Sequence, residues 1–399
     1  MKQKKTFTLF NIKYAAIQGF YWMMFCSVIG YVSTYLLNHE FNNSQIGAIL
    51  AISNIVAVII QPIIADFIDK QKKISIITII CCLLTIILML SIILTFIGKS
   101  FIVLCMIITP IITVITALHP LVNSLSFLYE KDGVLINFGL ARGFGSLSYA
   151  VVSIIIGNFI ELFSPTIIPI FYVITILGIL IFVSTFRLPK VKNEMKIKSN
   201  KRIESSNKEK TSILIFIKKY RKFMVMLCGA VFILFDHSLI NNFFAQIVYE
   251  IGGDNAQMGR AISLSAAVEL PMMLYFNKLK NKINCGTLLK LSGVLFTVKH
   301  FLTYIADSMS LLYLAQVFQL VAFGLFIPAA VYYVKQIMEE IDATKGQAFI
   351  TIAITLGGVF ASLVGGRVLD LYGASAMLLI GVISSFIGSI IMFFSCEQV

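Results

Sequence analysis

The side chains of this chain that could do chemistry are charged residues within long apolar stretches. Arg142 lies in the stretch 138–160, and Asp236, Glu269 and Lys299 lie in three others. An ionisable side chain inside a membrane-spanning helix costs roughly 2.5–3.5 kcal/mol on insertion scales, so each of the four is expected to face a partner, water or a solute. The alternatives are that Arg142 reaches the cytoplasmic surface and that the others form a structural ion pair.

The pattern around Arg142 predicts one polar helix face and one face for close packing. Residues four, seven and eleven positions after Arg142 share its face on a helix, and they are Ser146, Tyr149 and Ser153. A neighbouring stripe of small residues would let another helix backbone approach closely. Its members are Gly139, Gly143, Ala150 and Gly157.

Polar residues near helix breaks are further candidates for holding a solute. Pro120 frees a backbone carbonyl in the stretch 101–127, and Asn123 follows it within one turn. Packing inside the protein is an equally good explanation for the aromatic residues. The candidate solute-binding residues are Tyr21, Asn123, Arg142, Tyr149, Asn241, Glu269 and Gln319. The candidate proton-carrying residues are Asp236, His237, Glu269 and Lys299.

Apolar runs of about 20 residues recur along the whole chain and must position these side chains. Of the 399 residues, 58% are hydrophobic and 13% are charged, and the mean hydropathy is +0.92, which excludes a soluble domain. The first run is too long for a cleavable signal and lacks its cleavage site. The sequence predicts an all-α polytopic membrane protein with twelve transmembrane helices. They are expected at 10–37, 45–65, 74–97, 101–127, 138–160, 166–186, 223–249, 257–276, 287–305, 310–334, 347–366 and 374–395.

The basic residues indicate the orientation of these helices. All but four of the 32 Lys and Arg lie in the N-terminal tail and in the loops on its side of the membrane. The exceptions are Lys99, Arg260, Lys299 and Arg367. This positive-inside pattern predicts two cytoplasmic termini, in a cell membrane and most simply a bacterial inner membrane. The net charge of +13 therefore reflects topology and contact with the lipid bilayer, and nucleic acid is not expected as a partner.

Sequence patterns for enzymatic chemistry are absent. The seven cysteines lie in or beside apolar runs without metal-ligand spacing, and the four histidines are scattered. No HExxH, Walker or dinucleotide-binding motif occurs. We therefore expect no enzyme, no cofactor and no metal site, and we expect a monomer.

Two internal repeats divide the chain into halves. QIGAILAIS begins at Gln45 and QMGRAISLS at Gln257, a shift of 212 residues, while GNFIELFS begins at Gly157 and GRVLDLYG at Gly366, a shift of 209. A duplicated six-helix unit is a transporter plan. We expect six-helix bundles at 1–186 and 223–399, joined by a basic cytoplasmic linker at 187–222.

The loop after the second predicted helix carries a candidate conformational latch. Asp66 and Asp69 lie at the end of that helix, and Lys70 follows them. A carboxylate beside a basic loop can pair with a neighbouring helix end and hold one conformation. The alternative is a solvated loop whose charges follow membrane topology.

The chain resembles the major facilitator superfamily, and within it the lactose-permease group of oligosaccharide:proton symporters and their relatives for nucleosides and aromatic acids. The resemblance covers nearly the whole chain. Its specific pieces are QPIIADFIDKQKK from Gln61, with Ala65 where glycine is usual, FGLARGFGSLSYA around Arg142, VEL around Glu269, and VKQI at Lys335.

The resemblance implies roles for several residues. Arg142 matches that group's sugar-contacting arginine and Glu269 its binding and coupling glutamate. Tyr149 stands where the lactose permease has a tryptophan that stacks on the sugar, and Lys299 stands where it has an arginine. Asp236 lies near its seventh-helix aspartates.

Three departures from the group alter these implications. Ser124 replaces the glutamate that pairs with the arginine, and Ala322 and Leu325 replace the coupling histidine and the protonated glutamate. The departures argue against lactose as the solute and against proton coupling through that tenth-helix pair. Glu269 and Asp236, with His237, remain to carry a proton.

The expected function is proton-coupled symport of a small polar organic solute, a saccharide or a nucleoside, by alternating access. The alternative is a drug or metabolite exporter that works as a proton antiporter. The fifth helix has no proline between Gly157 and Pro165, which differs from the GxxxGPxxGG-type stretch usual in exporters of the superfamily. Sodium coupling is also open. An enzyme or a solute sensor on the same fold would need a nucleophile–base pair or an added soluble domain.

Overall fold

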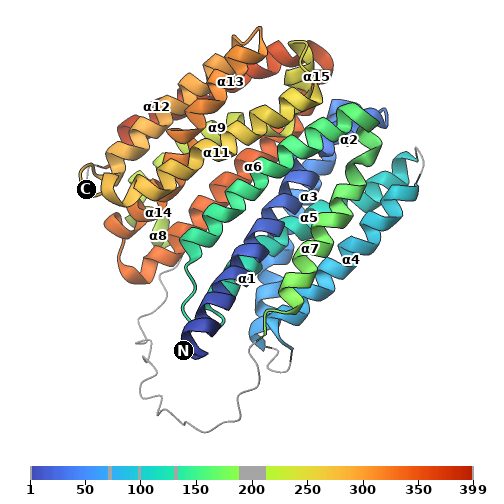
Figure 1. Cartoon of the computed structure of the whole chain (residues 1–399). Coiled ribbons are helices and arrows are strands. Elements are labelled where there is room, and N and C mark those ends of the chain that lie inside the picture. Colours follow the sequence, from blue (N-terminus) through green and yellow to red (C-terminus); the bar gives the residue numbers. More distant parts are fainter. Residues whose placement is uncertain (1, 71–73, 98–99, 130–133, 188–212, 398–399) are drawn as a thin grey trace.

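The computed structural model describes residues 2–70, 74–97, 100–129, 134–187 and 213–397, with the side chains of 2–8 and 69 left out. Every regular element in these ranges is helical. Figure 1 shows the helices before residue 188, blue to green, beside those after residue 212, yellow to red.

The first half contains the elements of six spans. They are α1 (Lys2–Phe25), the π-helical turn η1 (Cys26–Gly30), α2 (Val32–Asn38), α3 (Asn43–Lys70), α4 (Ile76–Phe96), α5 (Phe101–Ser124), η2 (Leu125–Phe127), α6 (Phe138–Phe163), η4 (Pro165–Ile167) and α7 (Ile168–Ser184). The second half contains α8 (Ile213–Lys219), α9 (Arg221–Asn242), α10 (Phe244–Glu250), α11 (Asn255–Leu279), α12 (Cys285–Tyr304), α13 (Met309–Val317), η5 (Phe318–Leu320), α14 (Phe323–Ile337) and α15 (Glu340–Ser395).

These elements confirm the predicted all-α fold of twelve spans. Nine helical segments of the described residues are long and apolar enough by themselves to cross a membrane. α11 and α12, with 25 and 20 residues, are long enough but carry more polar side chains. α15 contains two spans, because Gly373 has φ 80° and ψ 177°, a conformation that glycine adopts readily and that ends the first of them.

The predicted linker 187–222 is helical over most of its described part, because α8 and the start of α9 lie inside it; 188–212 lie outside the described residues. The Phe216 ring stacks on Phe349 of α15 at 5.3 Å between centroids. Lys219 Nζ lies 2.9 Å from Glu339 and 3.2 Å from the buried Asp342, and the bond to Glu339 raises the pKa of Lys219. α8 is thus attached to the second half, and the division into 1–186 and 223–399 stays a prediction.

Carboxylates that cross between the halves close the end of the molecule away from the chain termini. Asp370 of α15 accepts hydrogen bonds from the backbone N–H groups of Asn43 (2.9 Å) and Ser44 (2.7 Å) at the start of α3. Glu161 of α6 accepts from the backbone N–H (2.8 Å) and side-chain amide (2.6 Å) of Asn255 at the start of α11. Each carboxylate satisfies free donors at a helix N-terminus of the opposite half. We call these five residues the cross-half seal.

Backbone contacts behind the cross-half seal follow the same pattern. A side chain at Gly47 would collide with the carbonyl of Ser362, and one at Gly259 would collide with the carbonyl of Ser153. Gly259 follows Gly47 by 212 residues, and Ser362 follows Ser153 by 209. The helices that carry the repeated motifs therefore form reciprocal contacts, in which each half contributes the same two surfaces.

Candidate functional site

A cavity of about 280 Å³ lies between the halves, where charged and aromatic side chains meet. We call it the central cavity. Its lining residues from the first half are Trp22, Phe25, Ile29, Gly30, Arg142, Ser146 and Tyr149. Those from the second half are His237, Asn241, Phe244, Ile262, Ser265, Ala266, Glu269, Gln316, Gln319 and Phe323. The predicted polar face of α6 thus contributes three of its four members to the cavity.

Arg142 is held against an aromatic ring on the first-half wall. Its guanidinium carbon lies 3.9 Å from the centre of the Trp22 ring, and its Nη1 donates to Ser146 Oγ at 2.8 Å. Stacking on an aromatic face suits the planar guanidinium and leaves other N–H donors for a solute. Arg142 therefore faces the central cavity, with Trp22 fixing its orientation.

A chain of hydrogen bonds joins two predicted residues of the second-half wall, Glu269 and Gln319, to the predicted Lys299 behind it. Gln319 Nε2 donates to Glu269 Oε1 at 2.7 Å, and the buried Lys299 Nζ donates to Gln319 Oε1 at 2.5 Å. Gln319 lies in η5, a short 3-10 turn that separates α13 from α14. A broken helix beside a cavity is where transporters place polar groups.

His237 and Asn241 lie together on the same wall. Asn241 Nδ2 donates to His237 Nε2 at 3.0 Å, one helical turn apart on α9. The His237 ring also stacks on Phe323 at 4.8 Å between centroids. With Arg142 and Glu269, these residues bring charged, amide and aromatic groups of both halves to one space.

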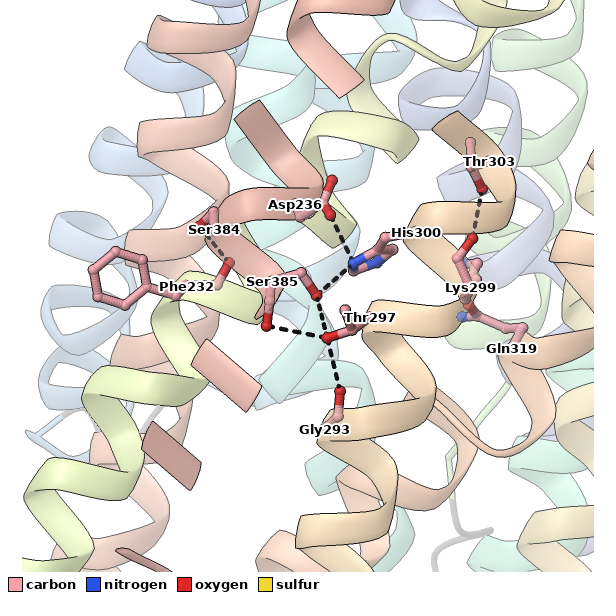
Figure 2. A network of polar contacts seen from close by, with 10 residues as sticks. All are labelled: Phe232, Asp236, Gly293, Thr297, Lys299, His300, Thr303, Gln319, Ser384 and Ser385. Carbon is pink, nitrogen blue, oxygen red and sulfur yellow. Dashed lines mark hydrogen bonds and ion pairs between the residues drawn. The ribbon is translucent and has the colours of Figure 1, made fainter. Parts of the chain in front are cut away.

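Asp236 lies away from the central cavity, in a separate buried network (Figure 2). Its Oδ2 lies 2.8 Å from His300 Nδ1, and the same nitrogen lies 2.9 Å from Ser385 Oγ. Asp236 and His300 are both 0% exposed. The space for the carboxylate exists because residue 381 is glycine, whose added Cβ would collide with Asp236 Oδ1. His300 is not among the residues predicted to bind the solute or to carry a proton, although it directly follows Lys299.

Besides Asp236 and Lys299, two other predicted residues lie outside the cavity lining. Tyr21 OH donates to the carbonyl of Ile115 at 3.1 Å, inside the first half. Asn123 accepts from Gln18 Nε2 at 3.1 Å and donates to His119 Nε2 at 3.2 Å. Both side chains are already hydrogen-bonded within their own half. Trp22, the neighbour of Tyr21, faces the cavity instead.

The predicted latch residues lie at the far end of α3 from the cross-half seal. Lys70 Nζ is 2.7 Å from Asp66 Oδ2, one turn apart on the same helix, and the two side chains are 73% and 61% exposed. The side chain of Asp69 lies outside the described residues. This ion pair therefore lies within α3, whereas the predicted latch would connect α3 to a neighbouring helix.

Comparison with known proteins identifies the family. Residues 12–380 match the sequence model of the MFS_1 like family. An uncharacterized transporter, YwbF of Bacillus subtilis (strain 168), is 27% identical over 383 residues, which cover 93% of this chain and 90% of YwbF. Maltose permease of Geobacillus stearothermophilus is 26% identical over 282 residues, covering 69% of this chain and 67% of the permease.

A solved structure supports the fold independently of sequence identity. The nucleoside transporter NupG superimposes with a TM-score of 0.77 at 15% identity, covering 97% of this chain and 98% of NupG. At this identity the likeness shows the fold, two six-helix bundles of the major facilitator type. The chain therefore belongs to the MFS_1 like family and is a multi-pass membrane transporter of the major facilitator type.

Proposed function

We propose that the protein is a symporter that carries a small polar organic solute, a saccharide or a nucleoside, together with a proton. The observation that supports this most is the meeting of Arg142 and Glu269, from opposite halves, at one central cavity. Maltose permease, which aligns with 69% of this chain, is named for a saccharide.

The lining of the central cavity suits such a solute. Hydroxyl and carbonyl groups of the solute would accept from the N–H donors of Arg142 and Asn241, and its own hydroxyls would donate to Glu269. The rings of Trp22 and Tyr149 offer apolar surface to a sugar or base ring. A cavity of about 280 Å³ is near the lower end of the roughly 300–1,000 Å³ typical of ligand pockets. The size favours a solute of one or two rings.

Proton coupling would operate through Glu269. Protonation of Glu269 changes the charge of the cavity by one unit, beside the cations Arg142 and Lys299. Gln319 connects Glu269 to Lys299, so a change in the charge of the Glu269 carboxyl would alter the hydrogen bonds of Gln319 and Lys299. A proton drives the solute only if the solute binds one protonation state better than the other. Glu269 would therefore both bind the proton and accept hydrogen bonds from hydroxyls of the solute.

Alternating access would require the cross-half seal to break. The positive-inside pattern places both termini, and hence the opposite end from the seal, in the cytoplasm. Opening to the outside would separate Asp370 from α3 and Glu161 from α11, while the two halves rock about the cavity.

Solute-induced proton uptake tests the proposal. De-energised cells that express the chain are suspended in weak buffer, and maltose, uridine and phenylpropionate are added in turn. We expect one solute to make the medium alkaline for wild type and to give no change for Glu269→Gln. Glu340→Gln, at an exposed position at the start of α15, is the matched control and should behave as wild type.

Two outcomes would overturn parts of the proposal. Labelled-solute uptake without a pH change, equal in wild type and Glu269→Gln, would remove the proton and leave a solute carrier. No uptake of any solute in the panel, with lower retention of preloaded solute in energised cells, would replace the symporter by an exporter.

A further inference from the structure

A second cavity, of about 610 Å³, is a groove on the membrane-facing surface between α12 and the last part of α15. We call it the α12–α15 groove. Its apolar walls are well exposed; Phe386 is 57% exposed and Phe394 82%. The lining residues are Val294, Thr297, Val298, Phe301, Leu302, Val382, Ile383, Phe386, Ser389, Ile390, Phe393 and Phe394.

The length of the α12–α15 groove matches one leaflet of a bilayer. Its walls run over Val294–Leu302 on α12 and Val382–Phe394 on α15. At 1.5 Å per residue these walls are about 12 and about 18 Å long. One leaflet is about half of the roughly 30 Å hydrocarbon core. The groove can therefore hold an acyl chain of a single leaflet.

The two hydroxyl groups of the groove, on Thr297 and Ser389, do not require a polar occupant; Ser389 is buried, with 7% of its surface exposed. Thr297 Oγ1 donates within the protein, to the carbonyls of Gly293 at 3.3 Å and Ser385 at 3.2 Å. The surface that an occupant meets is therefore apolar, as an acyl chain requires.

One end of the α12–α15 groove carries a positive charge. Lys290 lies one turn before Val294 on α12, and its Nζ is 5.3 Å from the centre of the Phe393 ring. No ion pair of Lys290 occurs among the described residues, and the nearby Glu397 is held by Lys222 at 2.8 Å. α12 begins and α15 ends here, which the positive-inside pattern places at the cytoplasmic leaflet, where anionic lipids gather.

We propose that the α12–α15 groove binds an anionic phospholipid of the cytoplasmic leaflet, with an acyl chain along the groove and the phosphate group at Lys290. This site is separate from the central cavity and does not depend on the transported solute. Its floor adjoins the buried network of Figure 2, because Thr297, which lines the groove, donates to the carbonyl of Ser385, and Ser385 Oγ lies 2.9 Å from His300 Nδ1. Lipid binding would therefore contact the helices that hold this pair.

Native mass spectrometry of the delipidated full chain, with phosphatidylglycerol and phosphatidylcholine of identical acyl chains added in equal amounts, tests the proposal. Wild type should retain phosphatidylglycerol over phosphatidylcholine by about fivefold, the ratio expected from one lysine at a membrane surface. Lys290→Gln should bind both lipids equally. Lys282→Gln, at an exposed loop position, is the matched control and should keep the preference.

A second variant separates the acyl chain from the charge. Val298→Trp would fill the α12–α15 groove and should lower retention of both lipids, whereas Val225→Trp, 44% exposed on α9 outside the groove, should not. An unchanged phosphatidylglycerol preference in Lys290→Gln would overturn the proposal. Retention by Val298→Trp equal to that of wild type would overturn it as well.

Discussion

Glu161 and Asp370 lie 209 residues apart in the sequence, and each accepts hydrogen bonds from the first backbone N–H of a helix in the opposite half. Counting side-chain donors as well, Asp370 accepts four hydrogen bonds, from the backbone N–H groups and side chains of Asn43 and Ser44. Glu161 accepts two, from the backbone N–H and side chain of Asn255. The two carboxylates are equivalent in position and unequal in the number of donors that they satisfy.

Neutralising either carboxylate should loosen the cross-half seal. Loss of a helix-capping side chain costs about 0.5–2 kcal/mol, and Asp370→Asn should lie higher in this range than Glu161→Gln because it weakens more hydrogen bonds. Hydrogen–deuterium exchange should therefore become faster at 43–47 in Asp370→Asn and at 255–259 in Glu161→Gln. Asp307→Asn, an exposed loop acid, is the control. Unchanged exchange in both variants would show that the carboxylates do not hold this end closed.

Replacing Arg142 by lysine should impair solute binding although the charge is kept. Lysine cannot reproduce the planar stack on Trp22 with several N–H donors in one plane. We expect the transport KM to rise about tenfold or more, since a charged hydrogen bond is worth about 1.5–3 kcal/mol. Labelled-solute uptake measures the change, with Arg221→Lys at the exposed start of α9 as control. A KM equal to that of wild type would mean that Arg142 does not contact the solute.

The Asp236–His300 pair should show strong coupling in a double-mutant cycle. Removing one partner leaves the other polar group buried without its hydrogen-bond partner, which costs about 1–3 kcal/mol. Asp236→Asn and His300→Gln should each lower the thermal unfolding temperature of the purified protein, and the double variant should lose clearly less than their sum. Additive losses would indicate that the two residues act independently.

Gly381 should tolerate no side chain, because the Asp236 carboxylate occupies the space in front of it. Gly381→Ala should destabilise the protein by about 1–3 kcal/mol, as overpacking does in other cores. Gly358→Ala in the first span of α15 is the control, since its Cβ would meet the nearest atom, Ser238 Oγ, at an ordinary 3.7 Å. Equal unfolding temperatures of the two variants would contradict the close packing of Asp236.

The sequence was sufficient for the spans and the family but less so for the orientation of side chains. The first span was expected to present Tyr21, yet Trp22 lines the central cavity, and on α9 His237 lines it while Asp236 does not. On the first span the predicted residue and the one that faces the cavity are neighbours, about 100° apart around the helix, whereas on α9 both neighbours are predicted and one of them faces the cavity. The apolar pattern could not decide between them, since in a membrane the lipid-facing and core-facing sides of a helix are both apolar.

The internal repeats do not by themselves predict the cross-half seal. The shifts of 212 and 209 residues are evidence of duplication, whereas the contacts join segments at other separations, 327 residues for Asn43 and Asp370 and 94 for Glu161 and Asn255. Sequence spacing alone does not reveal which helix ends meet. The geometry of the two halves supplied that information.

The reciprocity of these contacts has a consequence for the six-helix unit itself. Each half carries both a carboxylate and a helix N-terminus, and each carboxylate accepts from a backbone N–H at the helix N-terminus of the other half. An interface in which one surface meets the same surface after a half-turn is isologous, the kind that joins two identical subunits. At this end of the molecule, each half therefore presents a self-complementary surface of the kind found in homodimers.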